Sequence, residues 1–196
     1  MEAEPCLSLL VLTGHPTVII GDNGAYLHLD TDGGDPGLFL RTPISLKLQQ
    51  KIKPLLDGRV KVQYFLHTHN DGRVHHHLTR PFRIQAHPDG EALNQVIVRG
   101  KVVQMNKCDM HAVVRIFSEQ LREPFVVHAH GENDMLNAAL DFWAVKVSGQ
   151  VQGDLRVVAQ RIEQARVVIP EKFRGWKPDL SWRKAFIPAA GTETSG

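Results

Sequence analysis

The stretch from residue 96 to residue 170 constrains the fold most, because strand-like runs follow one another there with a single helical interruption. Five of these runs are rich in β-branched and aromatic residues: 96–105, 112–117, 125–130, 142–151 and 155–162. Between the third and fourth runs, residues 132–140 change to the spacing of a short helix. Gln152-Gly153-Asp154 joins the last two runs, with a glycine where a tight hairpin needs a positive φ. The stretch therefore predicts three strands, a short helix and two more strands.

This order of elements resembles the five-stranded OB barrel. The runs also mix arginine and lysine with phenylalanine, in the manner of small OB-fold, single-strand-binding-like proteins. The resemblance implies a mainly β fold, with an OB-like five-stranded barrel in the C-terminal half of the chain. It further implies binding of single-stranded DNA or RNA, with no catalysis and no cofactor.

The first half of the chain has a similar sequence pattern. Three short runs have strand character: 7–12, 17–20 and 25–30. Gly14-His15-Pro16 separates the first two runs and predicts a turn. Residues 43–56 have a spacing close to helical, and residues 59–84 predict a long hairpin. Two interpretations stay open for this half: a second OB-like barrel in tandem with the first, or one composite β domain.

These patterns predict three units along the chain. Residues 1–91 form a β-rich unit, residues 92–170 the OB-like barrel, and residues 171–196 a basic, aromatic tail whose end we expect to be disordered. The boundary is expected at His87-Pro88-Asp89-Gly90, because this turn-rich sequence lies between two strand regions.

The alternation within residues 59–84 predicts the register of the hairpin. Apolar side chains occupy even positions on both sides of the turn, from Val60 to Leu66 and from Val74 to Ile84. Even positions pair with even positions only across a loop of odd length. We therefore predict a three-residue tip, Asn70-Asp71-Gly72, with Gly72 in the left-handed region and His67 opposite His75.

Histidines cluster at this predicted tip. Four of them would share one surface of the hairpin, where imidazole nitrogens suit zinc or nickel: His67, His69, His75 and His77. His67-Thr68-His69-Asn70-Asp71 also resembles the first five places of the His-x-His-x-Asp-His signature of metallo-β-lactamase-fold hydrolases, which implies a metal-dependent hydrolase. Gly72 replaces the last histidine of that signature. The alternative is a histidine-rich hairpin tip that faces solvent, and we predict no bound metal.

The composition limits the cellular setting and the range of partners. The chain has 196 residues and a net charge of +2, and residues 156–184 hold 8 basic against 3 acidic residues. A mildly basic C-terminal region is compatible with an anionic partner. The sequence has only two cysteines, no secretory signal pattern, and no apolar run near the ~20 residues that span a bilayer. We expect a cytoplasmic protein with no membrane contact.

The predicted nucleic-acid site is the outer surface of the C-terminal barrel, together with the tail. Strand alternation turns cations and rings outward, and single-strand binding uses rings for base stacking and cations for phosphates. The candidate residues are Arg99, Lys101, Arg115, Phe117, Phe142, Lys146, Arg161, Arg174, Trp176 and Trp182. One alternative is that the N-terminal half or the tail packs on Phe117 and Phe142. A rival function is that of a β-domain adaptor or assembly factor whose exposed aromatics bind another protein.

Overall fold

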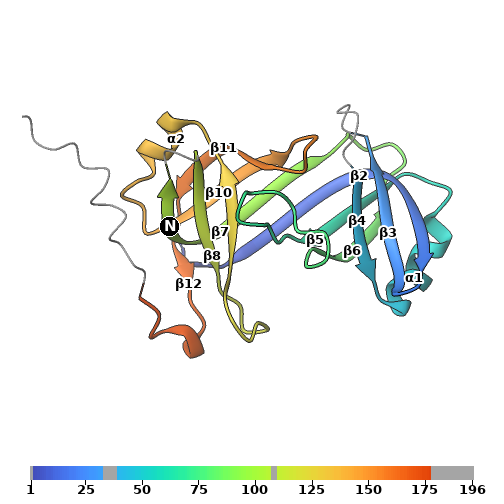
Figure 1. Ribbon diagram of the computed structural model, residues 1–196, viewed down its shortest axis with the longest axis horizontal. Coiled ribbons are helices and arrows are strands. Elements are labelled where there is room, and N and C mark those ends of the chain that lie inside the picture. The colour runs from blue at the N-terminus through green and yellow to red at the C-terminus, as the bar shows by residue number, and fades with distance from the viewer. Residues whose placement is uncertain (1, 33–38, 107–109, 178–196) are drawn as a thin grey trace, which may run out of the picture.

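The computed structural model describes residues 2–32, 39–106 and 110–177. The protein is mainly β and consists of two curled strand units, which we call the two rings, side by side along the long axis of the molecule (Figure 1). The buried apolar side chains of the two rings form one continuous cluster. The predicted fold class is therefore confirmed.

The second ring contains the predicted five strands and one helix. These elements are β7 (Asn94–Asn106), β8 (His111–Ile116), β9 (Phe125–His130), α2 (Asn133–Ala138), β10 (Ala144–Val151) and β11 (Val157–Gln164). β7 pairs with β8 and β10, β8 with β9, and β10 with β11, all antiparallel. A parallel pairing of Val158 with His130 closes the ring between β11 and β9. This is the strand order of an OB fold, as the sequence predicts.

The first ring repeats this order. Its elements are β2 (Leu7–Gly21), β3 (Gly24–Thr31), β4 (Phe39–Ile44), α1 (Leu46–Ile52), the 3-10 turn η1 (Lys53–Leu55), β5 (Val60–Phe65) and β6 (Arg80–Ala86). β2 pairs with β3 and β5, β3 with β4, and β5 with β6. β4 and β6 are neighbours, and no pairing joins them among the described residues. Of the two interpretations left open by the sequence, the first half thus follows the OB-like order.

β2 runs without interruption through Gly14-His15-Pro16, so the turn predicted there is wrong. Gly14 pairs with Val60 of β5 on one side and with Thr31 of β3 on the other. A side chain at this position would fall on the carbonyl oxygen of Asp30. The glycine therefore lets one long strand bend around the ring and serve two partners.

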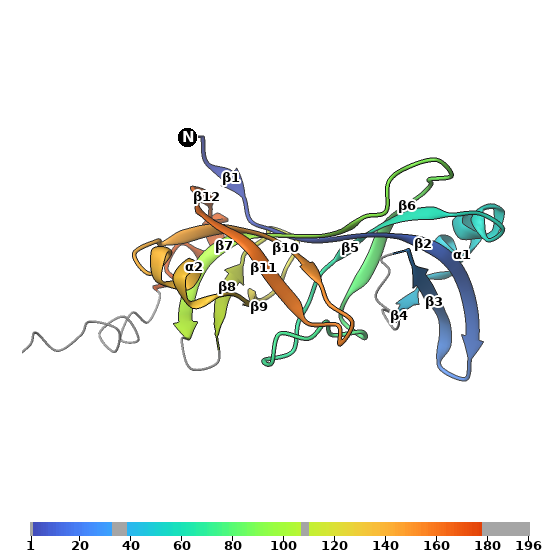
Figure 2. The ribbon, with the colours of Figure 1, turned by 90° about the horizontal axis from the view of Figure 1, so that it is seen from above.

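The two rings share one sheet, because β2 and β7 pair antiparallel from Leu7 opposite Arg99 to Leu12 opposite Asn94. Figure 2 shows this shared sheet running along the length of the molecule. The predicted boundary, His87–Gly90, lies in the connection between β6 and β7. β1 (Glu4–Pro5) pairs with β12 (Val167–Val168), and the 3-10 turn η2 (Glu171–Phe173) follows. The first residues of the chain therefore lie against the end of the second ring.

The predicted tip of the β5–β6 hairpin is confirmed. The backbone N–H of His75 donates to the carbonyl of His67 at 2.8 Å, and Thr68 forms a bridge with Val74. Gly72 has a φ of +81°, in the left-handed region.

The prediction of continuous pairing beyond the tip is wrong. Residues 75–79 form a turn, in which the N–H of Thr79 donates to His75, and β6 begins only at Arg80, opposite Phe65. Leu78 and Phe82, expected on the face of Tyr64, are consequently 49% and 43% exposed.

Two further expectations fail around β10. The strand begins at Ala144 and Trp143 before it is 53% exposed, whereas Phe142, expected outside, packs partly on the core. In the following turn the positive φ belongs to Leu155, at 63°, and not to Gly153. The carbonyl of Leu155 accepts a hydrogen bond from Val74, so the turn is held by a contact with the other ring.

Candidate nucleic-acid interface

The connection between β5 and β6, residues 66–79, docks onto the second ring instead of standing in solvent; we call it the hairpin. Its tip lies at the seam between β9 and β11, which pair with each other at a single position. Val74 donates its N–H to Leu155 at 2.8 Å, and Gly72 accepts from Val157 at 2.9 Å. The hydroxyl of Thr68 accepts from the backbone N–H of His128 at 2.8 Å. The hairpin thus satisfies backbone groups that the seam leaves unpaired.

The hairpin histidines stack on neighbours and do not surround one point. His69 stacks on His75 with ring centroids 4.1 Å apart, and His67 stacks on Phe125 of β9 at 3.9 Å. The ring of His77 is 6.2 Å from that of His75, edge-on. Within residues 2–32, 39–106 and 110–177, no group of three or more His, Cys, Asp or Glu side chains could hold a metal ion. The structure therefore does not assemble the metal site of the hydrolase hypothesis.

Three of the hairpin histidines favour the neutral form at neutral pH. Burial is the main cause that lowers the pKa of His67, His75 and His76, and neighbouring histidines lower each of them further. The Nδ1 atom of His76 is buried and has no hydrogen-bond partner among the described residues. A hydrogen bond with the backbone of Arg41 opposes the lowering of the His76 pKa.

A cleft lies where the hairpin approaches the outer face of the first ring. Tyr26 of β3 and Arg41 of β4 stack, with the guanidinium carbon 4.5 Å from the ring centroid. Together with His76 and His77 they line a pocket of about 460 Å³, which we call the Tyr26–Arg41 cleft. His28 lies opposite Arg41 on the same two strands. In OB folds, the second and third strands and the loop between the fourth and fifth form the ligand face, and these elements are β3, β4 and the hairpin.

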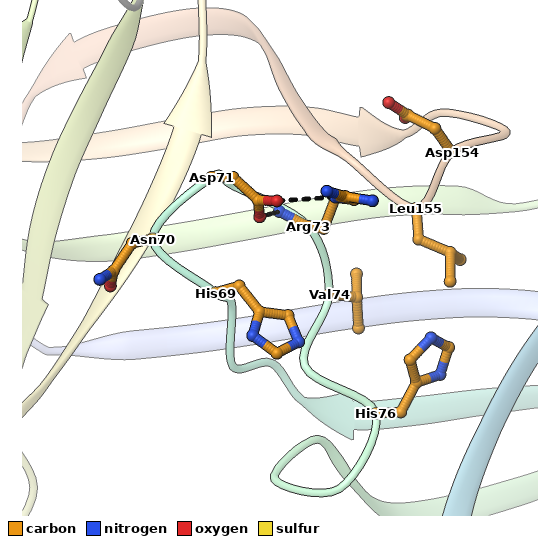
Figure 3. A pocket seen from close by; sticks show the side chains of 8 residues that line it. All are labelled: His69, Asn70, Asp71, Arg73, Val74, His76, Asp154 and Leu155. Carbon is orange, nitrogen blue, oxygen red and sulfur yellow. Dashed lines mark hydrogen bonds and ion pairs between the residues drawn. The ribbon is translucent and has the colours of Figure 1, made fainter.

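A second pocket extends this cleft toward the other ring. It has a volume of about 620 Å³, and Figure 3 shows the side chains that line it: His69, Asn70, Asp71, Arg73, Val74, His76, Asp154 and Leu155. His76 lines both pockets, so they are neighbours. Arg73 pairs with Asp71, with Nε and Oδ2 2.7 Å apart. The backbone N–H of Arg73 is the main cause that lowers the pKa of the Asp71 carboxyl.

The predicted residues Arg115 of β8 and Phe117, directly after this strand, lie under the start of the tail. Phe117 is 1% exposed, because the rings of Trp176 and Phe173 pack on it at centroid distances of 5.2 and 5.7 Å. The guanidinium of Arg115 lies 4.8 Å from the centroid of Trp176. Arg174 pairs with Glu171 of the same segment at 3.2 Å. Of the two alternatives for Phe117, packing by the tail is therefore the one that the structure has.

The other predicted residues form a band around the second ring. Lys101 lies opposite Arg115, Arg99 opposite Lys146, and Ser148 opposite Arg161. These pairs span β8, β7, β10 and β11, four consecutive strands of the five-stranded ring. The predicted site on the outer surface of this ring stays a prediction.

Acidic neighbours engage several members of the band. Arg99 forms an ion pair with Glu4 and donates to the carbonyl of Pro5 at 2.8 Å. Arg161 pairs with Glu163 at 2.7 Å, and Glu163 also lies opposite Lys146. Among the remaining predicted residues, Phe142 packs partly on the core, and Trp182 lies outside the described residues, as does the end of the tail.

The Tyr26–Arg41 cleft was not predicted from the sequence. Alternation in residues 25–30 does place Tyr26 and His28 on one side of a strand. The pairing of β3 with β4 brings Arg41 to them, and the turn at residues 75–79 brings His76. Both are contacts between segments distant in sequence, so a local pattern could have identified Tyr26 alone.

Comparison with known proteins finds a likeness among solved structures. No protein-family model matches the chain, and no curated protein matches its sequence. Among solved structures, the wild-type single-stranded DNA binding protein from Thermus aquaticus is similar, with 18% sequence identity and a TM-score of 0.49. The match covers 86% of this chain and 97% of that one. In the part of the chain described, no helix is long and apolar enough to cross a membrane.

Proposed function

We propose that the protein binds single-stranded nucleic acid, without catalysis, in the Tyr26–Arg41 cleft. The observation that carries the proposal is the stacked Tyr26–Arg41 pair on the ligand-bearing strands of an OB-like ring, with the hairpin beside it. A tyrosine ring can stack on an unpaired base, which contributes about 1–3 kcal/mol per base. The adjacent guanidinium can contact the phosphate on the same nucleotide.

Several properties of the cleft favour a single strand over a duplex. A base can stack on Tyr26 only if it is unpaired and turned away from a partner strand. The imidazoles of the hairpin add further flat surfaces and hydrogen-bonding atoms, and His69 and His76 line the neighbouring pocket. None of these groups reads one base specifically, so binding is tolerant of sequence and accepts DNA or RNA.

The cations in the band around the second ring extend the binding surface beyond the Tyr26–Arg41 cleft. Lys101, Lys146 and Arg161 lie on the outside of three neighbouring strands. A strand that leaves the first ring can follow them through its phosphates. The contribution of each is small, since Arg161 already pairs with an acidic side chain. We place this activity in the cytoplasm, where two cysteines without a pairing pattern stay reduced.

Fluorescence anisotropy of a labelled oligothymidine tests the proposal. Tyr26→Ala and Arg41→Ala should each weaken binding by about tenfold, which corresponds to a loss of about 1.4 kcal/mol. Lys47→Ala serves as a control, because Lys47 is an exposed cation on α1 outside the cleft. Binding by both cleft variants with the wild-type affinity would exclude the cleft as the site.

A second candidate function, an adaptor that binds another protein, is favoured by an exposed aromatic pair. Phe65 and Phe82 stack with centroids 4.2 Å apart and are 46% and 43% exposed. Phe65 and Leu78 also line a groove of about 210 Å³ that reaches Phe125 of the second ring. This function would be favoured if the protein bound no oligonucleotide at low salt. It would be favoured further if the Phe82→Ser variant no longer bound a protein partner that the wild type binds.

A further inference from the structure

Residues 171–176, which we call the 171–176 segment, cover the outer face of β8. The Nζ of Lys172 donates to the carbonyls of Glu119 and Leu121, both at 2.6 Å, in the loop after the strand. Phe173 and Trp176 then pack on Phe117. These contacts fix the segment at one edge and lay an indole over the strand.

The covered face has the position of a ligand face. β8 is the second strand of its ring, and in OB folds the face of the second and third strands binds the ligand. The indole of Trp176 meets Phe117 edge-on and lies beneath the guanidinium of Arg115. An unpaired base presents the same flat aromatic surface, with a phosphate that suits the guanidinium. Trp176 thus occupies the place that a base would take.

The two rings differ in whether this face is open. In the first ring the Tyr26–Arg41 cleft is open to solvent and lined by polar side chains. In the second ring Phe117 is 1% exposed beneath the segment. The segment forms no strand pairing with the ring among the described residues, and Trp176 itself is only partly buried. A small number of side-chain contacts therefore holds it in place.

We propose that Arg115 and Phe117 form a second site for single-stranded nucleic acid, and that Trp176 covers this site until a base displaces it. The inference rests on the proposed function. The first ring binds the strand first, and the 171–176 segment competes with the same strand for the second ring. Displacement requires the loss of one ring contact and one cation–π contact, a cost of about tenfold in affinity.

Anisotropy titration of a labelled oligothymidine long enough to span both rings tests the competition, with the full chain in every case. Trp176→Ala should bind about tenfold more tightly than the wild type, because the indole that competes with the base is gone. Adding Phe117→Ala to that variant should remove the gain. Trp143→Ala is the matched control, since Trp143 is an exposed tryptophan of the same ring outside the segment, and it should bind as the wild type does.

Unchanged or weaker binding by Trp176→Ala would overturn the inference and leave the proposed function standing, provided that Tyr26→Ala still weakens binding. If neither the wild type nor any variant bound oligothymidine, both the inference and the proposed function would be overturned.

A second measurement does not depend on affinity. It tests the inference even if the variant that combines Trp176→Ala with Phe117→Ala fails to fold. In a chain with Trp143→Phe and Trp182→Phe, Trp176 is the only tryptophan left. Its emission should shift to the red when oligothymidine displaces it into water. An emission spectrum that stays the same at saturating oligothymidine would contradict the displacement.

Discussion

At the residue scale, two glycines determine how the long strands bend. Gly14 of β2 and Gly100 of β7 hold equivalent places in the two rings, and a Cβ at either would fall on a carbonyl oxygen of the next strand, that of Asp30 or Arg115. Because the obstacle is backbone, it cannot move aside as a side chain could. These two positions therefore require glycine.

Gly100→Ala should lower the free energy of unfolding by more than about 2 kcal/mol, in the range of overpacked cores. Urea denaturation measures this change. Gly175→Ala is the control, because nothing lies within 4 Å of a Cβ at that position, and its effect should stay within about 0.5 kcal/mol. Equal stability of the two variants would mean that β7 does not approach β8 as closely as the structure has it.

His128 makes stability depend on pH. The side chain is 9% exposed, and burial lowers its pKa to about 4, with smaller contributions from His111 and His130. The unfolded histidine has a pKa near 6.5, so the unfolded chain binds the proton first as the pH falls. The folded state is therefore most stable, as far as His128 is concerned, above about pH 6.5. It loses stability as the pH falls from there to about pH 4. The upper limit of the loss is about 3 kcal/mol, at 1.36 kcal/mol per pKa unit.

Urea denaturation of the wild type and His128→Asn at pH 7 and pH 5 tests this effect. The wild type should lose more stability than the variant between the two pH values, although His67, His75 and His76 act in the same direction in both. A variant as sensitive to acid as the wild type would show that His128 is not the group responsible.

At the scale of elements, the hairpin ties the two rings together. Its tip supplies hydrogen-bonding groups to β9 and β11, and a Cβ at Gly72 would lie 2.7 Å from the ring of His130. The docking also places His76 beside the Tyr26–Arg41 cleft. The hairpin therefore contributes both to the stability of the pair of rings and to the shape of the proposed site.

Thr68→Val should destabilise this docking, because the buried N–H of His128 loses its acceptor at a cost of about 1–3 kcal/mol. Hydrogen exchange measures the effect directly, as faster exchange of the His128 amide. Thr17→Val on the exposed side of β2 has the same change of side chain and should leave the exchange of that amide unaltered. Equal protection of the amide in both variants would argue against docking at Thr68.

Elements that depend on local pattern could be predicted from the sequence. Alternation located the strands of the second ring, and the odd-length loop placed His67 opposite His75. The prediction of a turn at Gly14 was wrong. Gly14 lies within a strand and pairs with two neighbouring strands, and its local sequence does not distinguish it from a glycine that ends a strand. The packing of Trp176 on Phe117 could be stated only as one of two alternatives, since it joins segments far apart in the chain.

At the scale of the whole molecule, two rings with the same strand order carry different surfaces. The pairing of β2 with β7 holds them in one sheet, with the hairpin as a second connection. The sequence predicted the OB-like order in the second half and left it open in the first. It did not predict how the rings are joined, because β2 and β7 carry no local sign of pairing with each other. One ring presents the open Tyr26–Arg41 cleft, and the other is covered by Trp176.

The central claim is that this pair of rings binds single-stranded nucleic acid through stacking and phosphate contacts. The most direct measurement is the affinity for a labelled single strand over a series of salt concentrations, with a duplex of the same sequence as competitor. We predict that the logarithm of the affinity falls with the logarithm of the salt concentration by about 0.7 for each phosphate contacted. Arg41→Ala should reduce that slope by about 0.7, whereas Tyr26→Ala should weaken binding and keep the slope. A duplex that competes as well as the single strand, or an affinity independent of salt, would contradict the claim.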